Sequence, residues 1–359
     1  MSNSFSGIII SWYNKNKRDL PWRQTTDPYK IWLSEIILQQ TRVVQGLPYY
    51  EKFVNAFPSV HDLAAADEQQ VLRLWQGLGY YSRARNLHAC AIMVVESFDG
   101  KFPQTAAELK KLKGIGDYTA AAIASFSFRE PVPVLDGNVF RVISRYFGIT
   151  ADIADPKNKK EFYPILEEVI DVDRPDAFNQ AIMEFGAMHC TPAKPLCLYC
   201  ELQSGCFAFQ NQQQSMLPVK IKKVKVRNRY FHYLVLISDG KVYMKERGAN
   251  DIWQGLHDFH LIESKAEHSS LEELLDEGQI TASELIDESA VFKHILTHQR
   301  IFAKFHMISV QDKKPFADMI SKMKGHDFEA VSSIPKPKLI DNYLNEVFFS
   351  LALYKDKSD

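Results

Sequence analysis

The chain has 359 residues, of which 46% are hydrophobic, 24% charged and 12% aromatic. This composition excludes a disordered or fibrous protein, and the length predicts two or three globular domains. The net charge of -1 does not exclude a nucleic-acid partner, because phosphate binding requires a local basic surface and not a basic average. No stretch is long and apolar enough to span a membrane, so we expect a cytoplasmic protein with reduced cysteines.

A first helix is predicted within residues 5–24 and a second over residues 27–42. Asp27 suits the N-cap of the second helix and Pro28 suits its first position. Glu35 stands alone in an apolar run of this helix, and glutamate is seldom buried without a partner. It either faces solvent from a polar edge, or is buried with a raised pKa or a specific partner, and the buried alternatives indicate function.

Between residues 46 and 150 helical segments alternate with short turns, and two more helices are expected over 156–188. This pattern predicts an all-α region of many short helices around one core, which we expect to span residues 1–214. Residues 215–229 form a predicted linker, since Val219–Arg229 carries only basic charges.

Beyond the linker the hydrophobic period changes to two, which predicts a smaller α+β domain over residues 230–359. An Asp239-Gly240 turn is a strong hairpin signal. The predicted elements are strands at Tyr230–Ile237, Lys241–Lys245, Ala290–Leu296 and Ile301–Val310, a helix near Leu271–Glu277, and a terminal helix from about Lys338.

Four cysteines, Cys190, Cys197, Cys200 and Cys206, follow the spacing C-x6-C-x2-C-x5-C, whereas Cys90 stands apart and is expected to be a core thiol. Four thiolates suit either a tetrahedral zinc ion or an iron–sulfur cluster. Zinc modules usually have two close pairs of ligands and this chain has one, but the spacing alone leaves both metals open.

Two further segments are candidates for chemistry. Gly114 and Gly116 bracket one residue between two predicted helices, and such a turn can present backbone N–H groups to a phosphate. For an isolated G-x-G pattern, however, a plain helix–helix turn is the favoured interpretation. Asp136 suits the N-cap of the next helix, which is all that most such aspartates do, yet a capping carboxylate is held rigidly and kept ionised. With a protonated Glu35 it would form the acid–anion pair used in glycosidic bond cleavage.

Together these segments resemble the helix-hairpin-helix DNA glycosylases and, within them, the adenine DNA glycosylase (MutY) family. The resemblance covers most of the chain and rests on motifs that occur in order: Leu20–Arg23, Trp32–Thr41, Gly77–Arg83, the hairpin, Leu135–Val139, the cysteine spacing and a Nudix-like C-terminal domain. It implies an all-α helix-hairpin-helix fold with a [4Fe–4S] cluster on the four cysteines. It is the resemblance, not the spacing, that favours the cluster over zinc.

The resemblance also implies roles for single residues. Glu35 would protonate the leaving adenine, and Asp136 would stabilise the oxocarbenium-like sugar or bond to it transiently, with Tyr118 and Asn138 in support. In related glycosylases of the endonuclease III type a lysine stands in place of Tyr118. Because tyrosine cannot form a Schiff base, a monofunctional reaction is expected.

Other matched positions concern DNA. Those that match the adenine pocket are Trp22, Arg23 and Glu184, and those that match contacts or wedges beside the opposite 8-oxoguanine are Gln40, Thr41, Leu78 and Tyr80. An enzyme that extrudes a base must fill the gap, although an aromatic residue in a Tyr-Tyr pair is by itself more often core packing. Backbone N–H groups of Gly114 and Gly116, the region around Lys194 and the basic linker would hold phosphates.

The C-terminal domain departs from the family pattern in two ways. It lacks the Nudix box, so we expect a recognition module and no metal-dependent pyrophosphate hydrolysis. The family's Phe-Ser-His recognition loop is matched by Phe292, Lys293 and His294, with lysine where serine is usual. A lysine donates hydrogen bonds but cannot accept them, and an ordinary surface lysine on a strand is the alternative.

We therefore expect a monomeric, monofunctional DNA glycosylase of base excision repair, associated with the bacterial nucleoid. Its substrate would be double-stranded DNA with adenine opposite 8-oxoguanine or, less readily, guanine. Two alternatives remain open, namely a bifunctional glycosylase/AP lyase and a non-catalytic iron–sulfur protein that binds DNA.

Overall fold

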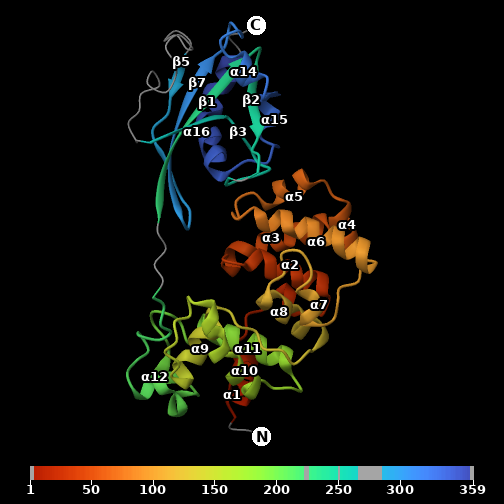
Figure 1. Ribbon diagram of the computed structural model, residues 1–359, viewed down its shortest axis with the longest axis vertical. Coiled ribbons are helices and arrows are strands. Elements are labelled where there is room, and N and C mark those ends of the chain that lie inside the picture. The colour runs from red at the N-terminus through yellow and green to blue at the C-terminus, as the bar shows by residue number, and fades with distance from the viewer. Residues whose placement is uncertain (1–3, 222–225, 250, 266–284, 356–359) are drawn as a thin grey trace. The chain divides into compact units, whose positions relative to one another are not determined.

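The computed structural model describes residues 4–221, 226–249, 251–265 and 285–355. The chain divides into two compact units (Figure 1). The helical unit comprises Met1–Ala65 and Asn86–Lys223, and the sheet unit comprises Ala66–Arg85 and Val224–Asp359.

The helical unit confirms the predicted all-α region. Short 3-10 helices connect its α-helices at η1 (Pro21–Arg23), η2 (Pro156–Glu161), η3 (Cys197–Tyr199) and η4 (Gln203–Gly205). The α-helices are α1 (Phe5–Asn16), α2 (Pro28–Leu38), α3 (Val43–Ala56), α4 (Val60–Ala65), α6 (Ser82–Phe98, which begins in the sheet unit), α7 (Ala106–Leu109), α8 (Asp117–Phe128), α9 (Gly137–Phe147), α10 (Tyr163–Val169), α11 (Pro175–Met188) and α12 (Phe207–Gln210).

The start of α2 is as predicted, but its end is not. The Asp27 carboxylate accepts a hydrogen bond of 3.0 Å from the Tyr29 N–H, and Pro28 occupies the first turn. The helix ends at Leu38 rather than near residue 42, so Gln40 and Thr41 lie in the turn that comes next. Gln40 has a φ of 55°, a left-handed conformation that is uncommon outside glycine and clusters at functional sites.

The packing of four helices brings distant parts of the chain to one place. Helix α11 packs against α1, α8 and α9, and α2 packs against α3 and α8. At Gly186, in α11, a Cβ atom would lie 2.7 Å from the Cβ atom of Asn138, so only glycine permits this close approach to the start of α9. These contacts arrange α2, α8, α11 and the start of α9 around a common space.

The predicted hairpin is present between α7 and α8, which pack against each other. Gly114 has a φ of 76°, and a side chain there would also collide with Asn86, whose Cβ atom lies 2.8 Å from an ideal Cβ position. Both constraints require glycine at the first of the two positions.

The sheet unit confirms the predicted α+β domain. It holds an eight-stranded sheet with the order β3-β2-β1-β7-β5, in which β4 also pairs with β1, β6 with β7, and β8 with β2. Strands β1 and β7 run parallel, whereas the other pairs are antiparallel. The strands are β1 (Arg227–Ser238), β2 (Lys241–Glu246), β3 (His257–Asp258), β4 (His260–Ser264), β5 (Leu285–Glu288), β6 (Phe292–Ile295), β7 (Gln299–Ser309) and β8 (Lys324–Asp327).

Helices complete the sheet unit: α5 (Glu68–Trp75), α14 (Ala317–Ile320), α15 (Phe328–Val331) and α16 (Lys338–Lys355). One face of the sheet packs on Leu339, Ile340 and Tyr343 of α16, which is the predicted terminal helix. The Asp239-Gly240 turn has φ values of 50° and 68° and joins the antiparallel strands β1 and β2, as predicted. The helix expected near Leu271–Glu277 lies outside the described residues, as do Lys222, Lys223 and Lys225 of the linker.

Residues 66–85 group with the sheet unit, whereas a continuous region over 1–214 was expected from the sequence. Arg85 donates a hydrogen bond of 2.6 Å to the Gln254 carbonyl, and the Gln69 amide donates one of 3.3 Å to the Gly255 carbonyl. Such contacts between segments far apart in sequence have no signature in local periodicity.

Two smaller expectations concern membrane spans and burial. No helix among the described residues is both long and apolar enough to cross a membrane. Cys90 is fully buried in α6, and this burial raises its thiol pKa to about 12, as expected of a core residue.

Candidate active site

Glu35 is buried in α2, with only 8% of its surface exposed, which excludes the solvent-facing interpretation. Desolvation is the main cause that raises its pKa to about 7, and the negative charge of Asp136 raises it further. Hydrogen bonding from Tyr118 and the positive charge of Arg23 act in the opposite direction. The carboxyl group can therefore carry a proton near neutral pH.

Asp136 caps α9 as predicted. Its carboxylate accepts hydrogen bonds from the backbone N–H groups of Asn138 and Val139 at 2.9 and 2.8 Å, and from the side-chain amide of Asn138 at 2.7 Å. Burial raises the pKa of Asp136, and these three hydrogen bonds oppose the rise without cancelling it. The expectation that the helix end keeps Asp136 ionised left out burial, which shifts the pKa the other way.

Tyr118, in α8, interacts electrostatically with both carboxyl groups. Burial, followed by the charges of Glu35 and Asp136, holds its phenol pKa well above the ordinary value, so the hydroxyl stays protonated. It donates a hydrogen bond of 3.3 Å to the sulfur of Met183. The structure thus brings together Glu35, Tyr118, Asp136 and Asn138, the four residues to which the resemblance assigns catalytic roles.

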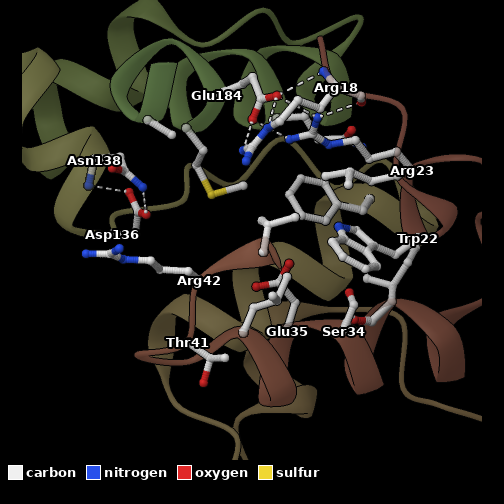
Figure 2. A pocket seen from close by; sticks show the side chains of 18 of the residues that line it. Arg18, Trp22, Arg23, Ser34, Glu35, Thr41, Arg42, Asp136, Asn138 and Glu184 are labelled. Carbon is white, nitrogen blue, oxygen red and sulfur yellow. Dashed lines mark hydrogen bonds and ion pairs between the residues drawn. The ribbon is translucent and has the colours of Figure 1, made fainter. Parts of the chain in front are cut away.

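A cavity of about 490 Å³ opens beside these residues. Figure 2 shows Glu35 rising into it from α2, Asp136 and Asn138 at one side, and Glu184 across from Glu35. The other predicted residues that line it are Tyr118, Trp22, Arg23 and Thr41, and residues that sequence reasoning missed include Arg18, Arg42, Val44 and Met183. Its size suits a base-sized ligand with part of a sugar.

Glu184 is held by two arginines at the wall of this cavity (Figure 2). Its carboxylate accepts hydrogen bonds from the Arg18 guanidinium at 2.8 and 2.5 Å and from the Arg23 guanidinium at 3.0 and 2.8 Å. Burial alone would raise its pKa, but the hydrogen bonds from both arginines lower it to about 2. Glu184 is therefore a fixed anion that orients two cations. Sequence reasoning missed Arg18, because its only signal in the sequence is a basic residue five positions before Arg23.

A second cavity of about 650 Å³ shares Glu35, Tyr118 and Asp136 with the first. Gly114 and Gly116 of the hairpin also line it, as do Gln40 and Lys159. Lys159 and Lys110 both pair with Asp117, the first residue of α8, at 3.3 and 2.6 Å. The structure thus joins the hairpin and the turn after α2 to the carboxyl pair.

Two arginines of α9 tie this site to the cysteine segment. Arg141 donates hydrogen bonds to Asn138 Oδ1 at 2.9 Å and to the Cys190 carbonyl at 2.7 Å. Arg145 donates to the Thr191 carbonyl at 2.7 Å and the Pro192 carbonyl at 3.0 Å, and its Nη1 lies 3.4 Å from Cys190 Sγ. Neither arginine was singled out from the sequence, because the bonds from Arg141 to Cys190 and from Arg145 to Thr191 join positions more than forty residues apart.

All four clustered cysteines line one small cavity of about 30 Å³. None forms a disulfide, and burial raises the thiol pKa of Cys197, Cys206 and Cys200, the last to about 11. Within the described ranges no three His, Cys, Asp or Glu side chains stand close enough to hold a single metal ion. Four thiols that line one cavity and form no disulfide are a donor set that fits either a tetrahedral zinc ion or an iron–sulfur cluster.

The predicted lesion contacts of the sheet unit lie in a turn after α5. Tyr80 has a φ of 50° and is 45% exposed, which excludes the core-packing interpretation, and its hydroxyl bonds to the Thr297 hydroxyl. Leu78 is only 7% exposed.

The segment that matches the family's recognition loop is part of a strand, as predicted for Ala290–Leu296. Phe292, Lys293 and His294 lie in β6, where Phe292 packs on Phe305 and His294 lies against Trp253. Only Lys293 points outward, with its ammonium group 5.6 Å from the Phe302 ring. This orientation follows from the alternation of the strand, since every second side chain turns into the core. The adjacent turn is instead at Leu296–Gln299, closed by a hydrogen bond of 2.8 Å.

The remaining predicted phosphate contacts lie at the surface. Lys194 is exposed in the loop between Cys190 and Cys197. The start of the linker is bound to the helical unit, since the Val219 carbonyl accepts a hydrogen bond of 3.0 Å from the Ile153 N–H. The Ile221 N–H donates another, of 3.1 Å, to the Asp152 carboxylate.

Comparison with known proteins agrees with this architecture. Residues 33–171 match the HhH-GPD superfamily of base excision DNA repair proteins, and residues 232–346 match the NUDIX domain. A solved thermostable thymine-DNA glycosylase is 29% identical with a TM-score of 0.54 over 58% of this chain and 95% of that one. A non-covalent endonuclease III–DNA complex shares the fold, at 20% identity and a TM-score of 0.51 over the same shares.

Curated relatives extend the match to the whole chain. An adenine DNA glycosylase of Buchnera aphidicola subsp. Schizaphis graminum is 32% identical over 347 residues, which cover 96% of this chain and 98% of that protein. The adenine DNA glycosylase of Homo sapiens is 43% identical over 223 residues, 60% of this chain and 41% of that protein. With this identity over almost the full length of both proteins, and with matches to the HhH-GPD superfamily and the NUDIX domain, the chain belongs to the adenine DNA glycosylase family.

Proposed function

We propose that this protein is a monofunctional glycosylase that removes adenine mispaired with 8-oxoguanine, and less readily with guanine, by hydrolysis of the N-glycosidic bond. The observation that carries the proposal is the buried Glu35, whose pKa of about 7 makes it a proton donor at neutral pH beside the carboxylate of Asp136. A pair of carboxyl groups, one acting as the acid and the other as the anion, is what glycosidic cleavage uses.

Each group of the site has a role in the proposal. Glu35 protonates adenine as the bond to the sugar breaks, which makes the base a better leaving group. Asp136 stabilises the positive charge that develops on the sugar or bonds to it transiently, and Asn138 fixes its orientation. Trp22, Arg23 and Glu184 line the space for the extruded adenine.

The monofunctional assignment rests on Tyr118, which offers a hydroxyl where a lyase needs an amine. Lys159 lines the second cavity and is the feature that favours a bifunctional alternative, although its ammonium group is paired with Asp117. Borohydride reduction during turnover distinguishes the two. We expect no covalent protein–DNA adduct, and a high yield of adduct that disappears in Lys159→Gln would establish the alternative.

Contacts with the DNA are assigned to turns and basic segments. Gln40 and Thr41 of the turn after α2, and Leu78 and Tyr80 of the turn after α5, contact or wedge beside the orphaned 8-oxoguanine. Of the segment Phe292–His294, only Lys293 faces outward, so it alone is proposed as a contact. The phosphates are held by the N–H groups of Gly114 and Gly116, by the loop around Lys194, and by the basic linker.

We further propose that Cys190, Cys197, Cys200 and Cys206 hold a [4Fe–4S] cluster. Their shared cavity and the arginine bonds to the neighbouring carbonyls support a structural role, in which the loop over residues 191–196 is shaped to face DNA. When bound, the cluster would crosslink the segment over residues 190–206. No step of the hydrolysis is assigned to it.

The domains are proposed as a catalytic region over residues 1–214, a basic linker over 215–229 and a lesion-recognition domain over 230–359. Residues 66–85 of the catalytic region group with the sheet unit. The last lacks a Nudix box, so no hydrolysis of nucleotides is assigned to it. The protein would act as a monomer on chromosomal DNA in the cytoplasm of a bacterium, at the nucleoid, as the similarity to Buchnera relatives supports.

The test is adenine release from duplexes with adenine opposite 8-oxoguanine, guanine, cytosine or thymine, measured with excess enzyme. We expect fastest release opposite 8-oxoguanine, slower release opposite guanine, and none above background opposite thymine. Equal rates for all four duplexes would reject the mispair specificity, and no release from any of them would reject the activity.

A further inference from the structure

One exposed face of the sheet unit is both basic and aromatic. It is formed where β6, β7 and β1 lie side by side, and we call it the β6–β7 face. Lys293 pairs in register with Phe302, which pairs with Tyr230, while Ile295 pairs with Arg300. Side chains of paired residues point to the same side of a sheet. The β6–β7 face therefore consists of Asn228, Tyr230, Lys293, Ile295, Arg300 and Phe302.

Contacts confirm the arrangement. The rings of Tyr230 and Phe302 stack with centroids 5.4 Å apart and planes 23° apart, and the Lys293 ammonium lies 5.6 Å from the Phe302 ring. Ile295 is 67% exposed, and Lys293 and Arg300 are also exposed. The opposite sides of the same strands are buried, since Ile301 and Ala303 belong to the core under α16. The exposed side is thus a formed surface and not a frayed edge.

The two cations of this face, Lys293 and Arg300, differ in their pairing from other basic residues that the structure describes in the sheet unit. Elsewhere in the sheet unit Arg229 pairs with Asp251 and Glu263, and Lys304 pairs with Glu288. Within the described residues, by contrast, neither Lys293 nor Arg300 has a carboxylate partner. Two unpaired cations beside a flat aromatic pair suit a phosphodiester chain, which offers regularly spaced negative charges.

The β6–β7 face is also continuous with a proposed DNA contact. Strands β6 and β7 are joined by the turn that holds Thr297, and the Thr297 hydroxyl bonds to the Tyr80 hydroxyl. Tyr80 is the exposed aromatic residue proposed to wedge beside the lesion. A duplex engaged at Tyr80 therefore has its flanking backbone within reach of the first residues of β7, where Arg300 lies.

We propose that the β6–β7 face binds the phosphate backbone of the duplex next to the lesion, with Arg300 and Lys293 as the phosphate ligands. This inference rests on the proposed function of the sheet unit in lesion recognition and deepens it. It assigns Lys293 to the backbone and not to the 8-oxoguanine base. The contact would add affinity for any duplex, whereas lesion discrimination would come from the turn residues.

The test uses full-length protein and fluorescence anisotropy with two duplexes. One is undamaged, and the other has 8-oxoguanine opposite 2′-fluoro-2′-deoxyadenosine, whose fluorine disfavours the oxocarbenium-like state and so prevents cleavage. The variants are Arg300→Gln, Lys293→Gln and their combination. Lys314→Gln is the matched control, because Lys314 is an exposed lysine beyond the other end of β7.

We expect each single variant to weaken binding of both duplexes about 3- to 10-fold at roughly 0.1 M salt, with the plot of log Kd against log salt less steep by about one unit per lost contact. Arg300→Lys should retain most of the slope, since it keeps the charge, and Lys314→Gln should match wild type.

Two results would overturn the inference. Wild-type affinity and salt slope in the double variant would show that the β6–β7 face does not bind the phosphate backbone. A loss confined to the 8-oxoguanine duplex would show that these residues contact the lesion and not the backbone. Failure of the proposed function is separable, because it appears in wild type as absent adenine release, while the salt slope on the undamaged duplex still decides the role of this face.

Discussion

The side-chain amide of Asn138 donates a hydrogen bond of 2.7 Å to Asp136, the carboxylate that caps the same helix. Asn138 in turn accepts a hydrogen bond of 2.9 Å from Arg141, which also binds the Cys190 carbonyl. The anion of the site is therefore oriented before any substrate arrives, by a chain of bonds that reaches the cysteine segment. Groups fixed in this way need no reorganisation when charge develops on the sugar.

Loss of the Asn138 amide should slow the chemical step. In Asn138→Ala, Asp136 loses one of its three hydrogen bonds and Arg141 loses an acceptor, so we expect single-turnover adenine release to fall about 10- to 100-fold. DNA affinity should change less than about threefold. The exposed Asn55 offers the control Asn55→Ala, which should release adenine at the wild-type rate. Equal rates for both variants would show that Asn138 does not assist the reaction.

The rate should depend on pH through Glu35. A general acid must be protonated, and the pKa of Glu35 is about 7, so single-turnover release should be near its maximum below about pH 6 and fall about tenfold per pH unit well above 7. The measurement is the rate of adenine release from about pH 5.5 to 9 at saturating enzyme. A rate that rises across this interval would assign Glu35 to base catalysis.

Ionisation of Glu35 should also lower the free energy of unfolding as pH rises. Its pKa is about 7 in the folded chain against 4.5 in the unfolded chain, so its favourable contribution is complete below pH 4.5 and is lost as pH rises through 7. Glu35→Gln keeps the shape and removes the charge. We expect it to gain about 3 kcal/mol relative to wild type between about pH 5 and pH 8, measured by urea unfolding. A constant difference between the two proteins across pH would contradict the burial of an ionisable Glu35.

The Glu184 ion cluster makes the opposite prediction. Its pKa is about 2 in the folded chain, so it stabilises the fold above pH 4.5 and loses this effect as pH falls through 2. Glu184→Gln leaves Arg18 and the more buried Arg23 without their anion, and we expect a loss of about 2–4 kcal/mol at pH 7, reduced by the partial exposure of Arg18. The loss is measured by thermal unfolding, with Glu51→Gln, at an exposed position, as the control. Equal melting temperatures for Glu184→Gln and Glu51→Gln would show that Glu184 acts on substrate alone.

Removal of one thiolate tests the cluster. Cys200→Ser should lose most bound iron and the visible absorption of the purified protein, and should weaken DNA binding because the loop over residues 191–196 is no longer fixed. Cys90→Ala is the control, since Cys90 is a buried core thiol away from the cluster cavity, and it should keep its iron. Stoichiometric zinc and no iron in wild type would contradict the assignment.

The sequence predicted the elements that depend on local chemistry. The Asp27 and Asp136 caps, the hairpin glycines and the Asp239-Gly240 turn follow from backbone requirements that few residue types meet, and all four are present. These signals are short-range, so one sequence suffices to detect them. The lone glutamate in an apolar helix made Glu35 a candidate, but the solvent-facing alternative stayed open, and it was the family resemblance that implied its pairing with Asp136.

The features that the sequence could not predict depend on tertiary packing. The bonds from Arg18 to Glu184 and from Arg141 to Cys190 join residues 166 and 49 positions apart, and nothing near either arginine signals its partner. The strand predicted over Ala290–Leu296 is present as Phe292–Ile295, but tertiary packing decides which of its faces is covered and therefore that Phe292 and His294 turn inward. The grouping of residues 66–85 with the sheet unit likewise arises from contacts made only in the folded chain.

The most direct test of the role of Glu35 compares wild type with Glu35→Gln in single-turnover adenine release from a duplex with adenine opposite 8-oxoguanine, at pH 7 and saturating enzyme. Glutamine preserves the volume of the buried side chain but cannot donate a proton to the base as it leaves. We predict tight binding by both proteins and a rate at least about 100-fold lower in the variant. Release by Glu35→Gln at the wild-type rate would contradict general-acid catalysis by this residue.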